Sequence, residues 1–328
     1  MEGFSTNWNG KEIKAHTISQ GNCKAIITNY GARIVQLWVN DSQGNATNVV
    51  FGYNSFDEYQ TTNEIYHGAV IGRYANRIAK GKFSIAHKKY DLACNNGANH
   101  LHGGPDGFHN QVWTIEDVTE HRMILSHHSP DGHEGYPGNL DVQVVYTIEN
   151  NGLSIHYTAR CDQDTVLNIT NHAYFNLNGI GTGKVLDHTL QINASHFTPV
   201  DYTLIPTGEL QPVELTPFDF RKGVKIGDWI DDSHPQTRIG NGFDHNFCLD
   251  KKGNELTQAA IATGDLSQIR MEVMTTEPCV QLFVDDARKL FCLETQHYPN
   301  SPNEAKFPSV TVKANETFAS TTIYRFSI

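Results

Sequence analysis

Two titratable side chains stand in strand-like segments and could together move protons. His172 lies in the run TNHAYFNLNG (170–179), and Glu294 follows an apolar run in FCLETQ (291–296). An imidazole and a carboxylate can act as a general acid and a general base, each contributing about 10²–10⁴-fold to a rate. The two residues therefore predict proton-transfer chemistry, provided that the fold brings them together.

Each of these residues also has an ordinary structural explanation. A histidine in a strand is more often a hydrogen-bonded structural residue, and a Glu after an apolar run can simply point to water. Asn171 and Asn176, which are poor strand formers beside His172, favour a polar face that meets a ligand. For catalysis we expect partial desolvation to raise the pKa of Glu294, and an ordinary histidine pKa of about 6.5 to serve His172.

A second group of polar residues could hydrogen-bond a substrate rich in hydroxyls. Asn76 and Arg77 in GRYANRIAKG offer a carbonyl oxygen and many N–H donors. His102 precedes two glycines in LHGG, as in a loop held close to something, and Asp244 in NGFDHNF could accept two hydroxyl hydrogens. A surface ion pair for Arg77, a plain turn at His102 and an Asx turn at Asp244 remain open.

Metal, nucleotide and serine-nucleophile motifs are missing from the sequence. The chain has 17 histidines, but spacings such as His100/His102 and His121/His127 match neither H-E-x-x-H nor a Cys/His zinc pattern. No G-x-G-x-x-G follows a strand, and there is no Walker loop and no G-x-S-x-G. We therefore expect an enzyme with no metal and no cofactor.

Charge and composition narrow the class of partner. The 328-residue chain has a formal net charge of −11, which opposes nucleic acid and anionic membrane as partners and fits a neutral small molecule. Its six cysteines form no C-x-x-C pair and are expected to be free thiols. No signal-like start and no apolar run of bilayer length is present, so we expect a cytoplasmic protein, although a trimmed leader would look the same. We expect a monomer or homodimer.

The segments that must position the candidate site residues are predicted to be β-strands. Residues 138–161 alternate apolar and polar side chains on both sides of the turn ENNG, which predicts a β-hairpin with one buried face. The same alternation predicts further strands at 112–118, 123–127, 189–194, 269–275 and 318–327.

Helical periodicity is rare along the chain. One short helix is expected near FDEYQ, with Ser55 and Asp57 as candidate caps. No linker or short repeat divides the sequence. We therefore predict one all-β domain over residues 1–328, a large antiparallel β-sandwich with few short helices.

Taken together and in order, seven segments resemble the aldose 1-epimerase (galactose mutarotase) family. They are GRYANRIAKGKF, LHGGPDGFHNQVW, SPDGHEGYPGNLDVQVVYT, NHAYFNL, IPTGEL, GFDHNF and CLETQHYP. The resemblance implies the family's β-sandwich and a reaction that interconverts the α and β anomers of hexoses such as galactose and glucose.

The resemblance also implies a role for each site residue. His172 would be the general acid and Glu294 the general base, on either side of the bond between C1 and the ring oxygen. Arg77, His102 and Asp244 would hydrogen-bond sugar hydroxyls, helped by Asn76 and Gln281, the latter in VQLFV. The segment 282–293 is shorter than in typical members, which puts the rim of the pocket and the sugar preference in question.

Three other functions remain as alternatives. A non-catalytic sugar-binding module could use the same sandwich, because a fold does not dictate turnover. An epimerase for phosphorylated hexoses would need extra basic residues, which HLHGGPDGFHN lacks. A two-carboxylate glycosidase would need a second acid facing Glu294, for which the sequence suggests only Asp244.

Overall fold

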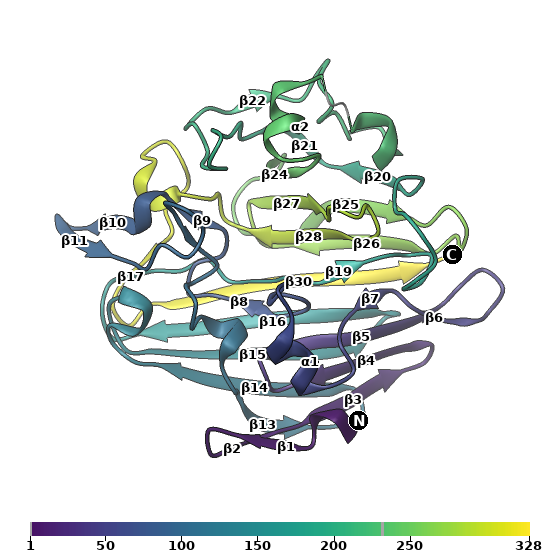
Figure 1. Cartoon of the computed structure of the whole chain (residues 1–328), viewed down its shortest axis with the longest axis horizontal. Helices are drawn as coiled ribbons and strands as arrows, with labels where there is room; N and C mark the ends of the chain where they lie inside the picture. Colours follow the sequence, from purple (N-terminus) through teal and green to yellow (C-terminus); the bar gives the residue numbers. More distant parts are fainter. Residues whose placement is uncertain (1, 231–232) are drawn as a thin grey trace.

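The largest sheet has nine antiparallel strands and forms one layer of a sandwich (Figure 1). The computed structural model describes residues 2–230 and 233–328. The strands of this sheet follow the order β13 (Thr114–Val118), β14 (Arg122–Ser129), β15 (Leu140–Glu149), β16 (Gly152–Cys161), β30 (Thr317–Ser327), β26 (Arg270–Thr275), β25 (Thr257–Thr263), β20 (Thr189–Ile192) and β23 (Val224–Lys225).

A seven-stranded and a four-stranded sheet form the other layer. The first has the order β22 (Gln211–Pro212), β21 (Ala194–Phe197), β24 (Asp244–Leu249), β27 (Cys279–Val284), β28 (Phe291–Gln296), β19 (Tyr174–Phe175) and β7 (Val50–Phe51). The second contains β3 (Ala15–Gln20), β4 (Cys23–Thr28), β5 (Arg33–Asn40) and β6 (Ala46–Asn48). The prediction of a large antiparallel β-sandwich is confirmed.

One apolar core lies between the layers. Ile27 of the four-stranded sheet, Leu282 of the seven-stranded sheet and Val144 of the nine-stranded sheet belong to a single buried cluster. Burial of apolar surface at about 25 cal/mol per Å² is the main force that holds the layers together. The opposite face of the seven-stranded sheet is left to carry polar side chains.

The predicted hairpin is present as β15 and β16. Glu149 pairs with Gly152, so the turn has two central residues, Asn150 and Asn151, with φ of 49° and 56°. Positive φ at both positions is the mark of a type I′ turn, which asparagine tolerates and which matches the twist of the strands. The predicted strands near 114–118, 122–129, 189–192, 270–275 and 317–327 are confirmed as well.

Helices are few within the described ranges. The predicted helix is α1 (Phe56–Thr61), where Ser55 is the N-cap and forms a capping box with Glu58, while Asp57 lies in the first turn rather than at the cap. A second short helix is α2 (Pro235–Ile239). None of the described helices is long and apolar enough to cross a bilayer.

Short two-stranded sheets and several 3₁₀ turns lie outside the three larger sheets. The paired strands are β1 (Thr6–Trp8) with β2 (Lys11–Ile13), β10 (Lys82–Ile85) with β11 (Lys88–Asp91), β9 (Arg77–Ile78) with β12 (His100–Leu101), and β17 (Thr165–Val166) with β29 (Thr311–Val312). In a fifth pair, β8 (Val70–Ile71) pairs with β18 (Thr170–Asn171), which ends directly before His172.

Candidate active site

Neighbouring strands of the seven-stranded sheet place the carboxylates and the amide on one face. Asp244 of β24 pairs with Phe283 of β27, and Gln281 of β27 pairs with Glu294 of β28. Side chains along a strand alternate between faces, so residues in register or two apart share a face. Asp244, Gln281, Phe283 and Glu294 therefore point away from the core, which receives Leu282 and its apolar neighbours.

His172 lies between two very short strands rather than inside one long strand. Its amide donates to the carbonyl of Ala69 and its carbonyl accepts from the amide of Gly68, both at 2.9 Å. The ring stacks on Tyr174 with a centroid distance of 4.9 Å and an interplanar angle of 21°. Only 5% of the residue is exposed, so both backbone and ring are held in place.

The two asparagines beside His172 do not face a ligand, contrary to the sequence-based expectation. Asn171 donates its side-chain amide to the carbonyl of Gly68, and Asn176 donates to the carbonyls of Gly183 and Lys289. Both are buried. Both side chains therefore bond backbone carbonyls around the irregular segment instead of facing the site.

His102 stands in a loop that approaches another backbone closely. Its φ is 52°, and a Cβ added at Gly103 would lie 1.9 Å from the carbonyl oxygen of Gly72, which explains the glycine at that position. The amide of Asn76 donates to Nδ1 of His102 at 3.1 Å. Nδ1 is therefore the acceptor nitrogen, and Nε2 of the neutral ring carries the proton.

Arg77 and Asp244 form a buried ion pair rather than a surface one. Nη1 of Arg77 lies 3.4 Å from Oδ2 of Asp244, with 9% and 14% of the side chains exposed. Asn96 accepts from Nε of Arg77 at 3.1 Å, and Gln281 donates to Oδ1 of Asp244 at 2.6 Å. Asp244 is the first residue of β24, so the Asx-turn alternative is wrong. Asn76 accepts from the amide of Arg77 with its side-chain oxygen.

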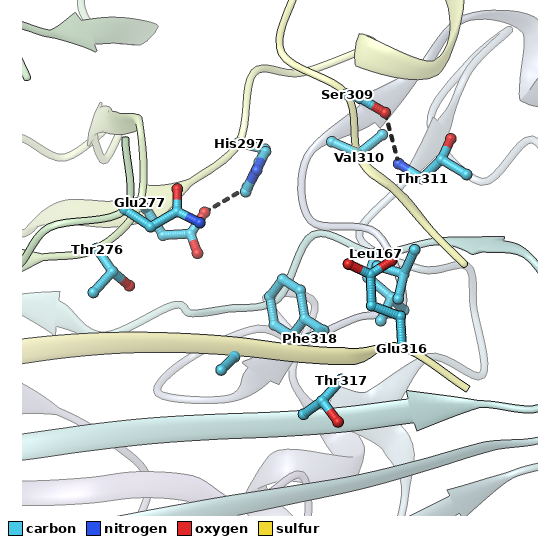
Figure 2. Close-up of a pocket in the computed structure, with 13 residues that line it drawn as sticks. Leu167, Thr276, Glu277, His297, Ser309, Val310, Thr311, Glu316, Thr317 and Phe318 are labelled. Carbon is cyan, nitrogen blue, oxygen red and sulfur yellow. Dashed lines mark hydrogen bonds and ion pairs between the residues drawn. The ribbon is translucent and has the colours of Figure 1, made fainter. Parts of the chain in front are cut away.

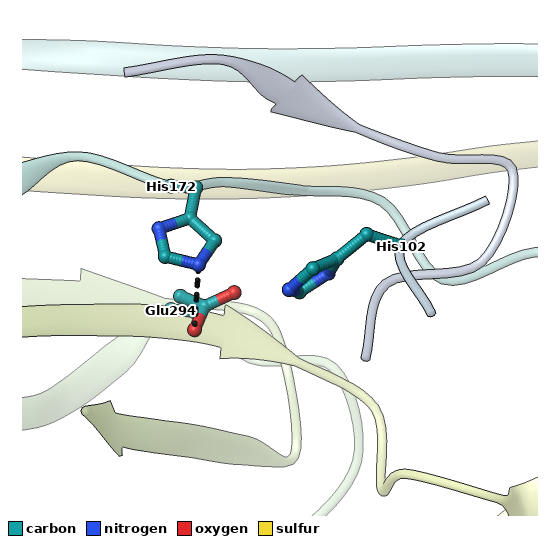
Figure 3. Close-up of side chains that lie close together, drawn as sticks. All are labelled: His102, His172 and Glu294. Atoms are coloured by element: carbon teal, nitrogen blue, oxygen red, sulfur yellow. Dashed lines mark ion pairs between the residues drawn. The ribbon is translucent and has the colours of Figure 1, made fainter. Parts of the chain in front are cut away.

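The predicted acid and base lie side by side. Nε2 of His172 is 3.6 Å from Oε1 of Glu294, and both side chains are almost fully buried (Figure 3). Nδ1 of the same ring contacts Sγ of Cys292 at 3.6 Å. The fold therefore brings the two predicted groups together, as the sequence analysis required.

Burial decides the proton affinities of this pair. Desolvation, assisted by the charge on His67, lowers the pKa of His172 to about 3. Desolvation, together with the charge on Asp244, raises the pKa of Glu294 well above its usual range. The expected rise at Glu294 is confirmed. The expectation of an ordinary pKa at His172 is wrong, because the sequence could not reveal that the ring is enclosed.

His102, His172 and Glu294 bring potential metal-ligand atoms within 4.8 Å of one another. The hydrogen-bonding of His102 does not fit a metal, however. A histidine that ligates through Nε2 normally donates a hydrogen bond from Nδ1, whereas Nδ1 of His102 accepts one from Asn76. The set fits hydrogen-bonded proton transfer better than metal coordination.

These residues line a cavity that is open to solvent and has a volume of about 480 Å³, counting the space at its mouth. Its walls are Glu64, Tyr66, Asn76, Arg77, Leu101, His102, His172, Tyr174, Asp244, Phe283 and Glu294. Six of the seven predicted site residues are in the wall. The seventh, Gln281, lies behind Asp244 and holds it by a hydrogen bond.

Five lining residues were not predicted from the sequence. Tyr174 and Phe283 could have been found, because each is two positions from a predicted site residue and shares its strand-like periodicity. Glu64, Tyr66 and Leu101 lie in irregular segments or at a strand end, where sequence spacing gives no comparable signal. Glu64 also means that Asp244 is not the only further carboxylate in this cavity.

The segment 282–293 forms a tight hairpin between β27 and β28. β27 and β28 stay paired as far as Val284 and Phe291. Asp285 closes the connection by accepting from the amides of Lys289 and Leu290 at 2.7 and 2.6 Å. The short connection therefore leaves Phe283 in place as part of the wall.

A second cavity encloses about 620 Å³ but contains none of the predicted residues (Figure 2). Its buried carboxylate, Glu277, accepts from Nδ1 of His297 at 2.6 Å. Burial lowers the proton affinity of this imidazole, but the charge and hydrogen bond of Glu277 outweigh it and raise the pKa of His297. The imidazole and the carboxylate are bonded to each other, which fits a structural role.

Comparison with known proteins assigns the chain to a family. The family model described as aldose 1-epimerase matches residues 14–325. The chain belongs to the aldose 1-epimerase family. The galactose mutarotase of Sus scrofa is 43% identical over 96% of this chain and 94% of that protein, and the aldose 1-epimerase of Escherichia coli is 32% identical over 94% and 93%.

Solved structures of aldose epimerases share the fold. A GalM/aldose epimerase homologue from C. elegans has a TM-score of 0.89 at 27% identity, covering 96% of this chain and 99% of that chain. A galactose 1-epimerase from Lactobacillus acidophilus has a TM-score of 0.85 at 27% identity, with 98% and 96% covered. The resemblance inferred from the sequence is confirmed, and the chain is an isomerase of the aldose 1-epimerase class.

Proposed function

We propose that this epimerase opens and closes the ring of a hexose with His172 as general acid and Glu294 as general base. The observation that carries the proposal is the 3.6 Å separation of these two buried side chains in the wall of one cavity. The hydroxyl oxygen on C1 and the ring oxygen are bonded to the same carbon. Two groups this close can each hydrogen-bond to one of those oxygens.

The reaction needs one proton taken and one proton given. The carboxylate of Glu294 takes the proton of the C1 hydroxyl while the C1 to ring-oxygen bond breaks, and the imidazolium of His172 protonates the ring oxygen. The open aldehyde rotates about C1–C2. The reverse transfers close the ring on the other face of C1 and restore the starting protonation.

For this reaction His172 and Glu294 must hold one proton between them, on either residue, before the substrate binds. Burial favours the uncharged forms, so the proton of the empty site belongs on Glu294. Arg77 favours the ionised carboxylate of Glu294, and Asp244 favours the imidazolium of His172. Hydrogen bonds from a bound sugar add to these interactions, and the proton then moves to His172.

We infer that the substrate is a neutral aldose such as galactose or glucose. The cavity contains one guanidinium, that of Arg77, and it is already paired with Asp244. The remaining carboxylates repel an anionic sugar, so no positive charge is left for a phosphate. Arg77, Asp244, Asn76 and His102 supply donors and acceptors for hydroxyls, with Gln281 supporting Asp244.

We also infer that the chain acts as one domain, since the cavity draws on residues from Glu64 to Glu294. Monomer and homodimer remain the two assemblies that we expect. A cytoplasmic location is likewise kept as an inference from the sequence.

Polarimetry of freshly dissolved α-galactose or α-glucose tests the acid–base roles. Replacing Glu294 by Gln keeps the shape of the side chain but removes the base, so we expect the enzymatic rate to fall by at least about a hundredfold. Glu120→Gln changes an exposed glutamate and serves as the matched control. A folded Glu294→Gln variant with wild-type turnover would reject the role of Glu294.

A further inference from the structure

Glu64, a third carboxylate in the cavity, has no part in the chemistry described above. We propose that Glu64 is a positioning residue for ring opening, which holds the rings of Tyr66 and Tyr174 on His172 and places a negative charge near Glu294. This inference rests on the proposed function and assigns a role to a residue that the acid–base mechanism alone does not require.

The position of Glu64 is fixed by a short turn after α1. The backbone amide of Glu64 donates a hydrogen bond to Oγ1 of Thr62 at 3.2 Å. Its carboxylate accepts from the amide of Tyr66 at 3.0 Å. It also lies close enough to the phenol of Tyr174 in the same wall for each group to affect the pKa of the other. One carboxylate therefore holds the loop that carries Tyr66 and lies next to the phenol of Tyr174, on the strand β19.

Both tyrosine rings lie against the catalytic imidazole. The ring of Tyr66 is nearly parallel to His172 at 5.9 Å, and that of Tyr174 is nearly parallel at 4.9 Å. Tyr66 also contacts the edge of His102 at 4.6 Å. Aromatic contacts of this kind are directional, so releasing either tyrosine loosens the orientation of His172 toward Glu294.

The same carboxylate acts on the proton shared by His172 and Glu294. Burial is the largest cause of the raised pKa of Glu294, and both Asp244 and Glu64 add to it while Arg77 opposes it. The titratable or charged groups around Glu294 are His172, His102, Arg77, Asp244, Glu64, Cys292, Tyr66, Tyr174 and Tyr324. Removing one negative charge from this set lowers the affinity of the acid–base pair for its proton, whichever member holds that proton.

Two substitutions separate the two effects. Glu64→Gln keeps an oxygen that can accept from Tyr66 and Tyr174 but has no charge, whereas Glu64→Ala removes both. For Glu64→Gln we expect kcat on galactose to stay within about threefold of wild type, and the alkaline limb of the pH–rate profile to move toward lower pH. For Glu64→Ala we expect kcat to fall about tenfold, the size of one lost hydrogen bond, with a smaller change in KM.

The measurements are polarimetric rates from acid to alkaline pH, corrected for spontaneous mutarotation, with Glu120→Gln as the control that should match wild type. Recovery of kcat by Gln relative to Ala together with the shifted alkaline limb supports the proposal. An unmoved alkaline limb in Glu64→Gln, or wild-type kcat in Glu64→Ala, overturns it. Neither result touches the main proposal, which stands or falls with Glu294→Gln.

Discussion

The enzyme buries many uncharged histidines, and this predicts a steep loss of stability in mild acid. His109 is the clearest case, because it is 1% exposed and neither ring nitrogen has a hydrogen-bond partner in the described part of the chain. Burial, followed by the charge on Arg33, lowers its pKa to about 3. A group whose folded pKa is depressed takes up a proton only on unfolding, so stability falls as pH drops from about 6.5 toward 3.

The magnitude follows from the two pKa values. Between pH 7 and pH 5 an unfolded histidine with a pKa of about 6.5 gains about 0.7 of a proton, while His109 gains almost none, which costs the fold about 1.9 kcal/mol. Seven histidines that are buried, or in the case of His127 partly buried, have a pKa lowered to about 3 or 4: His67, His100, His109, His127, His172, His188 and His245.

Together these histidines cost on the order of 10 kcal/mol at pH 5, which is comparable with the whole stability of a typical protein of about 5–15 kcal/mol. Glu64 and Glu294 offset part of the loss, because carboxyls whose pKa is raised in the fold become less unfavourable as the pH falls. The protein should therefore lose most of its stability near pH 5.

Urea unfolding at pH 7 and pH 5 tests the reasoning residue by residue. His109→Phe removes the titrating ring without breaking a side-chain hydrogen bond, so its loss of stability between the two pH values should be about 1.9 kcal/mol smaller than that of wild type. His121→Phe, at an exposed histidine, should leave the loss unchanged. If His109→Phe loses as much stability as wild type on acidification, the buried-histidine account is wrong.

Three further results are expected from the site. Arg77→Lys replaces a fork that bonds both Asn96 and Asp244 by a single ammonium, so KM for galactose in the polarimetric assay should rise about tenfold, and an unchanged KM would count against a role in sugar binding. Galactose 6-phosphate should be turned over at least about tenfold less efficiently than galactose, because the guanidinium of Arg77 is already neutralised; equal kcat/KM would contradict this. Incubation with EDTA should leave kcat unchanged, because Nδ1 of His102 accepts a hydrogen bond from Asn76 and so does not fit a metal ligand. A loss of activity that added zinc reverses would instead support a metal site.

Much of the framework could be predicted from local patterns. The hairpin of β15 and β16 was predictable because its period-two alternation and its two-asparagine turn both specify the same register. The helix after Ser55 was predictable because a capping box is a local signal. Such features depend on residues close together in the sequence.

The site itself was only partly predictable. Its residue types marked His172 and Glu294, but the distance between them depends on how β28 and the segment after β18 pack, which no local pattern encodes. The pKa expected for His172 was also wrong, because burial of its ring lowers the pKa below that of an exposed histidine. No signal in the sequence marked Glu64. Its proposed role depends on its proximity to Tyr174, which is far away in the sequence.

The paired strands β24, β27 and β28 restrict where this enzyme can tolerate insertions and deletions. Adding a single residue within one of them would turn Asp244 or Glu294 toward the apolar layer and bring a leucine or valine into the cavity. The connection 285–290 escapes that restriction because it lies beyond the last paired residues. Length changes among relatives should therefore collect at this hairpin tip, where they leave the register of the strands that carry Asp244 and Glu294 unchanged.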